Sequence, residues 1–148
     1  MNKYAEEIKS KTLSKSYLDG LTYRVLGAAI EVHKTIGSGL IESIYQQCMQ
    51  EELEQRGISF SNELKIPVFY KQKELAIDFR CDLFVENCLV VELKAVTEVT
   101  PLFEAQLLTY MKLLKAPKGI LINFNCPNIF MAGQKTFVNE YFKVLPEK

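Results

Sequence analysis

The chain has 148 residues, which suffice for one domain with its own hydrophobic core and are too few for two. Hydrophobic residues make up 48% and charged residues 24% of it, a balance that is typical of a soluble globular protein. Basic and acidic residues number 18 each, which excludes DNA binding through an overall basic surplus, so any nucleic acid would need basic residues gathered on one face or a bound metal ion.

The N-terminal part of the chain predicts a polar leader followed by two helices. The leader covers residues 1–19 and has no features of a signal peptide. Asp19 is the expected N-cap of the first helix, in which apolar residues recur at helical spacing up to a Gly-Ser-Gly stop at residues 37–39. A second helix is predicted over residues 40–56 and ends at Gly57.

Four strands and one long helix are predicted for the rest of the chain, with the strands over residues 58–72, 75–86, 88–96 and 119–125. Pro67 places the first strand at an edge or a bulge. The helix begins at Pro101 and ends near Leu114, while residues 129–144 fit either a strand or a helix. The order α-α-β-β-β-α-β predicts one α/β domain over residues 20–148. Its mixed four-stranded central sheet is flanked by helices, and the last strand runs parallel to a central one.

The most informative pattern is Asp82, followed by Glu92-Leu93-Lys94 in the third strand. Because residues two apart on a strand point to the same face, Glu92 and Lys94 project together. A charged pair in an otherwise apolar strand is costly to bury unless it is paired or binds a metal ion. Two carboxylates suit Mg²⁺, and a lysine beside them can orient a water or stabilise charge on a phosphate. The alternative is a simple ion pair between Glu92 and Lys94, with Asp82 in solvent.

Asp82 with Glu92-Leu93-Lys94 resembles the signature of the PD-(D/E)xK nucleases, with Cys81 in place of the proline. A second motif, G-x-x-E-x-x-Y at residues 39–45, is similar to that of the small prokaryotic GxxExxY family within this superfamily. The resemblance spans residues 20–140 and implies a restriction-endonuclease-like fold with an α-β-β-β-α-β core.

The same resemblance implies metal-dependent nuclease chemistry with Mg²⁺ or Mn²⁺ as the cofactor. The expected metal ligands are Asp82, Glu92 and the backbone carbonyl of Leu93, with Glu42 binding directly or through water. Lys94 completes the catalytic set. Glu42 also lies on the apolar arc of its helix, although a carboxylate at a helix start is equally suited to bonding a backbone donor there.

Gln106 and Tyr110 form a Q-x-x-x-Y pair on the long helix, one turn apart. After the E-x-K strand, this pair resembles the RecB-like exonuclease branch, in which the glutamine helps to hold the active-site carboxylates or lysine. Gln106 is therefore a candidate catalytic residue and Tyr110 a candidate second-layer residue. The alternative is a core tyrosine beside an amide that has found a hydrogen-bond partner.

The remaining candidates carry weaker signals. His33 and Tyr45 could touch the site from a second layer, although a lone histidine on an apolar helix face is more often a packing residue. Lys71 and Lys73, in a turn, are the best candidates for contacting the phosphates of a nucleic acid. The cysteines form no C-x-x-C pair, which argues against zinc and redox motifs and favours reduced, mostly buried thiols in a cytoplasmic protein; they are Cys48, Cys81, Cys88 and Cys126.

Three functions fit these residues. The first is a metal-dependent nuclease that acts on DNA, or less readily on RNA. The second is a catalytically silent binding or regulatory module, which the neutral charge and small size favour but which has no need of two acids side by side. The third is a hydrolase of small phosphorylated substrates, against which the missing phosphate-binding glycine loop argues. A homodimer would suit so small a domain, and no apolar run approaches the roughly 20 residues of a membrane span.

Overall fold

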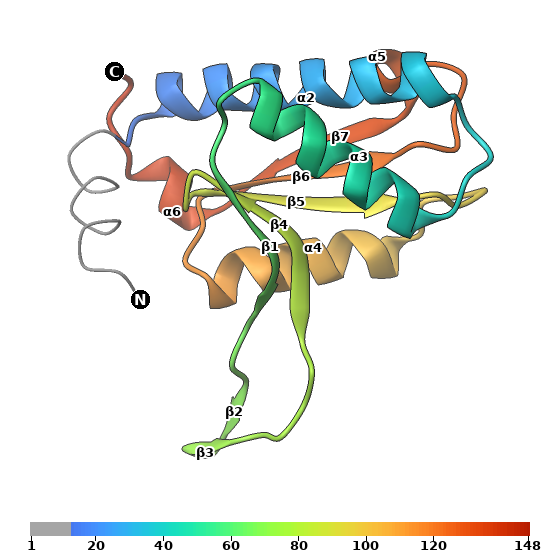
Figure 1. The fold of residues 1–148 in the computed structure, drawn as a ribbon. Helices are drawn as coiled ribbons and strands as arrows, with labels where there is room; N and C mark the ends of the chain where they lie inside the picture. Colours follow the sequence, from blue (N-terminus) through green and yellow to red (C-terminus); the bar gives the residue numbers. More distant parts are fainter. Residues whose placement is uncertain (1–12) are drawn as a thin grey trace.

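A mixed β-sheet between two layers of helices forms the centre of the computed structural model, which describes residues 13–148 (Figure 1). The helices are α2 (Lys15–Ile36), α3 (Glu42–Gln55), α4 (Pro101–Leu113), α5 (Ile129–Ala132) and α6 (Glu140–Lys143). The strands are β1 (Phe60–Lys65), β2 (Phe69–Tyr70), β3 (Lys73–Glu74), β4 (Arg80–Val85), β5 (Leu89–Lys94), β6 (Lys118–Asn123) and β7 (Gln134–Val138). The central sheet has the order β1-β4-β5-β6-β7, and β2 and β3 form a separate ribbon.

The first helix starts earlier than the sequence predicts. Ser14 is its N-cap, because the Ser14 side chain accepts a hydrogen bond of 3.1 Å from the backbone N–H of Tyr17. The prediction of Asp19 as N-cap is wrong, since Asp19 lies inside α2 and binds Lys118 at the start of β6, with 2.8 Å between Oδ1 and Nζ. Part of the predicted leader is therefore helical, and residues 1–12 of it lie outside the described part of the chain.

The long first strand predicted over residues 58–72 is interrupted at Pro67, which has no N–H to donate. β1 ends at Lys65 and pairs antiparallel with β4, while residues 66–79 leave the sheet and project from it as a hairpin (Figure 1). The second and third predicted strands correspond to β4 and β5, which are joined by a turn at Glu86-Asn87 whose two residues have positive φ angles, 50° and 55°.

The fold class is confirmed, and the tail adds a fifth strand to it. β4 and β5 are antiparallel, and the α4 crossover brings β6 alongside β5 in parallel, as the sequence predicts. The ambiguous tail supplies β7, which pairs antiparallel with β6 at the edge of the sheet, between the short helices α5 and α6. The sheet is therefore five-stranded, not four-stranded.

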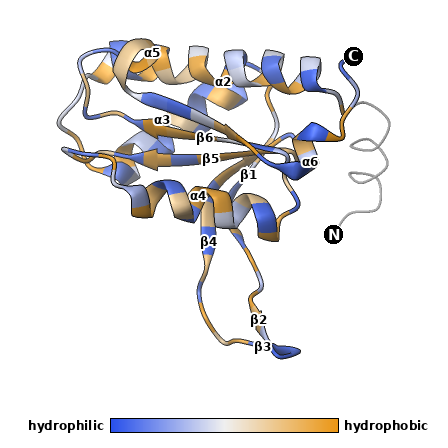
Figure 2. Cartoon of the chain, turned by 180° about the vertical axis from the view of Figure 1, so that it is seen from behind, coloured by the Kyte–Doolittle hydropathy of each residue, from blue (hydrophilic) through white to orange (hydrophobic). Residues whose placement is uncertain are grey.

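The two faces of the sheet carry separate hydrophobic layers. Val91 and Leu93 of β5 pack with α2 and α3, whereas Val90 packs with Leu107 and Met111 of α4. Figure 2 shows β5 and β6 as hydrophobic strands between helices of mixed hydropathy. Period-two alternation along β5 then puts Glu92 and Lys94 on the α4 side. Within residues 13–148 no helix has both the length and the apolar character that crossing a bilayer requires.

Candidate active site

The backbone hydrogen-bond ladder between β4 and β5 ends just before Asp82 and Glu92, the two predicted site carboxylates. Paired positions run from Val85 with Leu89 to Leu83 with Val91 and go no further. Beyond that point, Asp82 Oδ2 accepts the N–H of Leu93 at 2.8 Å, and Glu92 Oε1 accepts the N–H of Asp82 at 2.9 Å. Side-chain oxygens thus accept hydrogen bonds that strand carbonyls would accept in a continuous ladder. Each carboxylate uses one oxygen for this bond and has a second oxygen that does not take part in it.

Glu92 is buried and Asp82 is half-buried, and the two carboxyl groups are close enough to influence each other. Glu92 is only 5% exposed. Its burial, together with the charge of Asp82, raises the pKa of Glu92 to about 8. Burial likewise raises the pKa of Asp82 above its ordinary value. Hydrogen bonds from the backbone and the charge of Lys94 oppose these shifts without cancelling them. The pair is therefore costly to ionise in the absence of a cation.

Lys94 is held at the end of β5 by contacts with two helices. Its Nζ lies 4.5 Å from the centroid of the Phe103 ring on α4. Glu42, the first residue of α3, is its nearest acid, with 4.0 Å between Nζ and Oε1. The lysine side chain is 16% exposed and that of Glu42 is 47% exposed. Glu42 therefore stands at the open rim of the site and does not face inward as its helical position had suggested.

The G-x-x-E-x-x-Y motif has a structural explanation in the way it begins α3. Gly39 has a φ of 95°, which side-chain-bearing residues rarely adopt. The ring of Tyr45 stacks on Phe124 of the sheet layer, with 4.3 Å between centroids. Its hydroxyl donates to the carbonyl of Gly37 at 2.7 Å and accepts the N–H of Leu40 at 3.3 Å. Tyr45 thus fixes the loop from which Glu42 emerges.

The sequence did not identify Gln46 as a residue of this region. Gln46, only 9% exposed, donates through Nε2 to the backbone carbonyl of Asp82 at 2.8 Å. The same amide group also bonds Asn62 Oδ1 on β1, which Gln50 Nε2 contacts from the next turn at 2.8 Å. The only feature of the sequence that could have indicated Gln46 is its position one helical turn after Glu42. Gln46 therefore ties α3 to the strand segment that carries Asp82.

The two residues of the Q-x-x-x-Y pair have different surroundings in the structure. Tyr110 is 8% exposed, and burial followed by the charges of Glu92 and Asp82 raises the pKa of Tyr110 to about 12. Tyr110 thus lies close to the carboxylate pair. Gln106, one turn earlier, is half-buried, and among the described residues no hydrogen bond links it to either carboxylate.

The remaining candidates make other contacts or are exposed. His33 Nε2 is 2.9 Å from the carbonyl oxygen of Cys126, so its hydrogen-bond partner lies in the loop after β6. Lys71 and Lys73 are exposed at the tip of the projecting hairpin. Of the four cysteines, Cys81 and Cys88 are buried, and Cys48 and Cys126 are half-buried.

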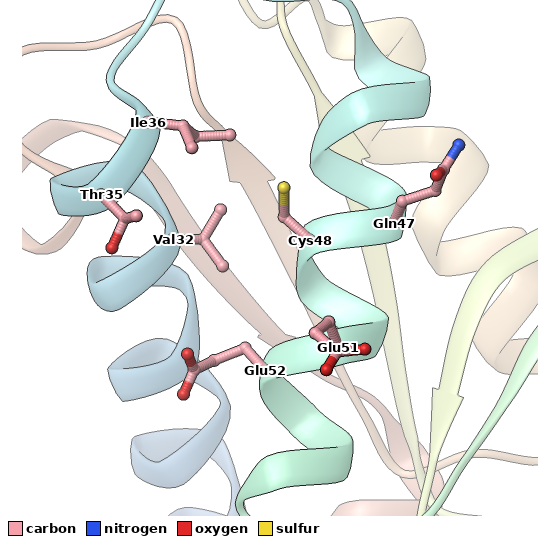
Figure 3. Close-up of a pocket in the computed structure, with 7 residues that line it drawn as sticks. All are labelled: Val32, Thr35, Ile36, Gln47, Cys48, Glu51 and Glu52. Atoms are coloured by element: carbon pink, nitrogen blue, oxygen red, sulfur yellow. The ribbon is translucent and has the colours of Figure 1, made fainter.

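Asp82 and Glu92 come together as a pair and not as part of a larger cluster. Among residues 13–148 no group of three or more His, Cys, Asp or Glu side chains is arranged to hold a metal ion. An open hollow does lie between α2 and α3 and is shown in Figure 3. It is lined by Val32, Thr35, Ile36, Gln47, Cys48, Glu51 and Glu52. Since the hollow includes neither carboxylate of the pair, it is not the candidate site.

The carboxylate pair suits a hard divalent cation by its chemistry. Both groups are oxygen donors, and both are fixed by backbone N–H groups through one oxygen each. A cation would favour their ionised forms, which burial disfavours. The donor set is incomplete without Glu42, water or a backbone carbonyl, and Mg²⁺ characteristically keeps several water ligands.

Comparison with known proteins gives one finding. Residues 19–136 match the model of a family described as the PD-(D/E)XK nuclease superfamily. Neither the curated proteins nor the solved structures include a significant match to the chain. The matched segment covers most of the chain and contains the ladder opening, both carboxylates and Lys94. On this evidence the chain belongs to the PD-(D/E)XK nuclease superfamily.

Proposed function

We propose that the protein is a divalent-metal-dependent nuclease that hydrolyses phosphodiester bonds in DNA. Membership of the superfamily points to nuclease activity in general. The observation that carries the proposal for this chain is the interrupted β4–β5 ladder, where the carboxylates of the half-buried Asp82 and the buried Glu92 replace strand carbonyls beside a lysine. The G-x-x-E-x-x-Y motif assigns the chain, within this proposal, to the GxxExxY family.

The proposed ligands of Mg²⁺ or Mn²⁺ are Asp82, Glu92 and the carbonyl of Leu93, with Glu42 binding directly or through water. When bound, the cation supplies Lewis-acid stabilisation of charge on the phosphate and lowers the pKa of a water molecule. The backbone N–H groups fix the orientation of both carboxylates, so the oxygens they present need little rearrangement.

Lys94 is proposed to hold the attacking water or the phosphate oxygens. Its Nζ is 4.0 Å from Glu42, which is too far for a hydrogen bond, so its donors remain available. The Phe103 ring, 4.5 Å away, keeps the ammonium group in place without neutralising it. The buried Tyr110, whose pKa is raised by burial and by the charges of both carboxylates, is proposed to exclude water from them, and Gln106, one turn earlier on α4, is proposed to join the site once substrate is bound.

The test is Mg²⁺ or Mn²⁺ binding by calorimetry, combined with cleavage of single-stranded DNA, duplex DNA, RNA and a small phosphodiester. Asp82→Asn and Glu92→Gln should each remove metal binding and cleavage while the fold remains. Glu54→Gln, an exposed residue of α3, is the matched control and should change neither. Cleavage by either site variant at the wild-type rate refutes the assignment. A wild-type protein that binds no metal and cleaves nothing identifies a silent member of the superfamily.

A further inference from the structure

Residues 66–79, called the arm here, form a hairpin that projects from one end of the sheet (Figures 1 and 2). The backbone N–H of Ile66 donates to the carbonyl of Phe79 at 2.7 Å and closes its base. Towards the tip, β2 and β3 pair, and the turn residues Lys71 and Gln72 have φ angles of 46° and 71°. Positive φ at two successive turn residues is typical of a tight hairpin. The arm is therefore a hairpin whose two sides are joined by backbone hydrogen bonds at its base and near its tip.

Large apolar side chains are exposed on this ribbon. Phe69 is 60%, Tyr70 64% and Ile77 45% exposed. Phe69 and Tyr70 are neighbours on β2, so they lie on opposite faces of the ribbon. Aromatic groups on a two-stranded projection cannot stabilise the hydrophobic core, and exposed apolar surface of this kind marks an interaction site.

Both lysines of the arm lie at its tip. Residues 66–79 contain two basic residues, Lys71 and Lys73, and two acidic ones. One of the acids, Asp78, is paired with Arg80 at the base. At the tip, Lys71 Nζ lies 5.5 Å from the centre of the Tyr70 ring. Within the described part of the chain, neither tip lysine has an acidic partner within 4.0 Å.

The arm begins at the candidate active site. β4 enters the sheet at Arg80, only two residues before Asp82. At its base, the Phe79 ring lies 4.8 Å from the ring of Tyr110, the residue next to the carboxylate pair. A ligand that follows the arm towards the sheet therefore arrives at the carboxylates.

We propose that the arm binds a single-stranded segment of the nucleic-acid substrate, with unpaired bases stacked on Phe69 and Tyr70 and phosphates paired with Lys71 and Lys73. Aromatic side chains stack on any base, but only where the base is not hidden in a duplex. About seven residues per side at strand spacing give the arm a reach of about 20 Å, or roughly six stacked nucleotides. This inference rests on the proposed nuclease function, which supplies the reason for guiding a strand to the site.

The basic tip favours nucleic acid over a second copy of the chain. In a symmetric pairing of two arms, each tip would meet an identical one, which would bring four lysines together with only two acidic residues, the two copies of Glu74. A polyanion removes that repulsion and releases counterions from its own phosphates.

Binding is measured in EDTA, which prevents cleavage, by fluorescence anisotropy of a labelled oligonucleotide of about 20 nucleotides and of its duplex. The single strand should bind more tightly, and shortening it below roughly six nucleotides should weaken binding sharply. Phe69→Ala with Tyr70→Ala should lower the affinity about tenfold or more. Lys71→Gln with Lys73→Gln should reduce the dependence of log affinity on log salt by about 0.7 per lysine.

The matched controls lie away from the arm. Phe130→Ala removes an aromatic ring that is 58% exposed on α5, and Lys112→Gln with Lys115→Gln removes two exposed lysines near the end of α4. Neither control should alter the affinity. Unchanged affinity in the arm variants overturns the inference, as does duplex binding as tight as single-strand binding. Conversion of a dimer to a monomer by Phe69→Ala with Tyr70→Ala, at constant affinity, also overturns it.

The outcomes separate this inference from the proposed function. Arm-dependent binding by a protein that cleaves nothing in Mg²⁺ refutes the nuclease and leaves the arm's ligand established. Cleavage that depends on Asp82 and Glu92, but proceeds equally in the arm variants, refutes the role of the arm and leaves the nuclease standing.

Discussion

Replacing Glu92 with glutamine should remove much of the pH dependence of stability of the metal-free protein. In the folded chain the pKa of Glu92 is raised to about 8, whereas the ordinary value of 4.5 applies after unfolding. Between these values the folded state holds a proton that the unfolded state has released. The free energy of unfolding therefore falls as pH rises through this window, and the stabilisation is fully present only below the lower value.

The size of this effect follows from the width of the window. Each pH unit inside it can change the free energy of unfolding by at most about 1.4 kcal/mol. From about pH 6 to about pH 8 the upper limit is thus roughly 3 kcal/mol, and we expect about 2 kcal/mol because Asp82 shares the titration. For a domain of this size, the change corresponds to about 4–8 °C in Tm. The amide introduced by Glu92→Gln would keep an oxygen that can accept the N–H of Asp82, so the fold should survive the substitution.

The assay is urea and thermal unfolding in EDTA at about pH 6 and about pH 8, for the wild type, Glu92→Gln and the control Glu54→Gln. The wild type and the control should lose stability at the higher pH, and Glu92→Gln should lose much less. Mg²⁺ at a hundred times its Kd should then stabilise the wild type by about 2.7 kcal/mol and leave Glu92→Gln unchanged. An equal pH slope in wild type and Glu92→Gln would show that Glu92 is not held protonated and refute the reasoning.

Three further substitutions test individual contacts of the fold. Gln46→Leu leaves the carbonyl of Asp82 without its donor, so it should cost about 1–3 kcal/mol in urea unfolding and also weaken Mg²⁺ binding in calorimetry. Gly133→Ala places a Cβ 2.8 Å from the carbonyl oxygen of Asn123 and should lower stability by about 1–3 kcal/mol. Gly20→Ala, with nothing within 4 Å of the new Cβ on an exposed helix face, should instead raise it by about 0.5–1 kcal/mol; a loss of stability there would contradict the helix.

The features that sequence predicted well are those decided by local period and burial. β5 is apolar at nearly every position, which predicts a buried strand. Glu92 and Lys94 are two residues apart on it and therefore share one face, and the structure places the apolar Val91 and Leu93 on the other. The crossover through α4 follows from a helix between two buried strands, because parallel neighbours require such a connection.

The features that sequence missed depend on partners far away in the chain. Ser14 and Asp19 are equally good caps, and the choice falls to Ser14 because Lys118 engages Asp19 from β6. Gln46 carries no local pattern that distinguishes it from the exposed Gln47, and only the position of Asp82 across the layer makes it a buried donor. β7 is a short edge strand with half-exposed residues, for which neither helical nor strand period is clear.

The carboxylate pair cannot be explained by stability alone. Continued strand pairing would have bonded the N–H groups of Asp82 and Leu93 to neutral carbonyls, yet the ladder ends here and the N–H groups bond to a half-buried and a buried acid. Together with Glu42 at the rim, these acids carry three ionisable carboxyl groups, and Lys94 carries one ammonium group. When all are ionised, two negative charges remain, which is the charge that one divalent cation would balance. Local rules broken at a structural cost are expected where a site serves a ligand, which agrees with the proposal of a divalent cation at this pair.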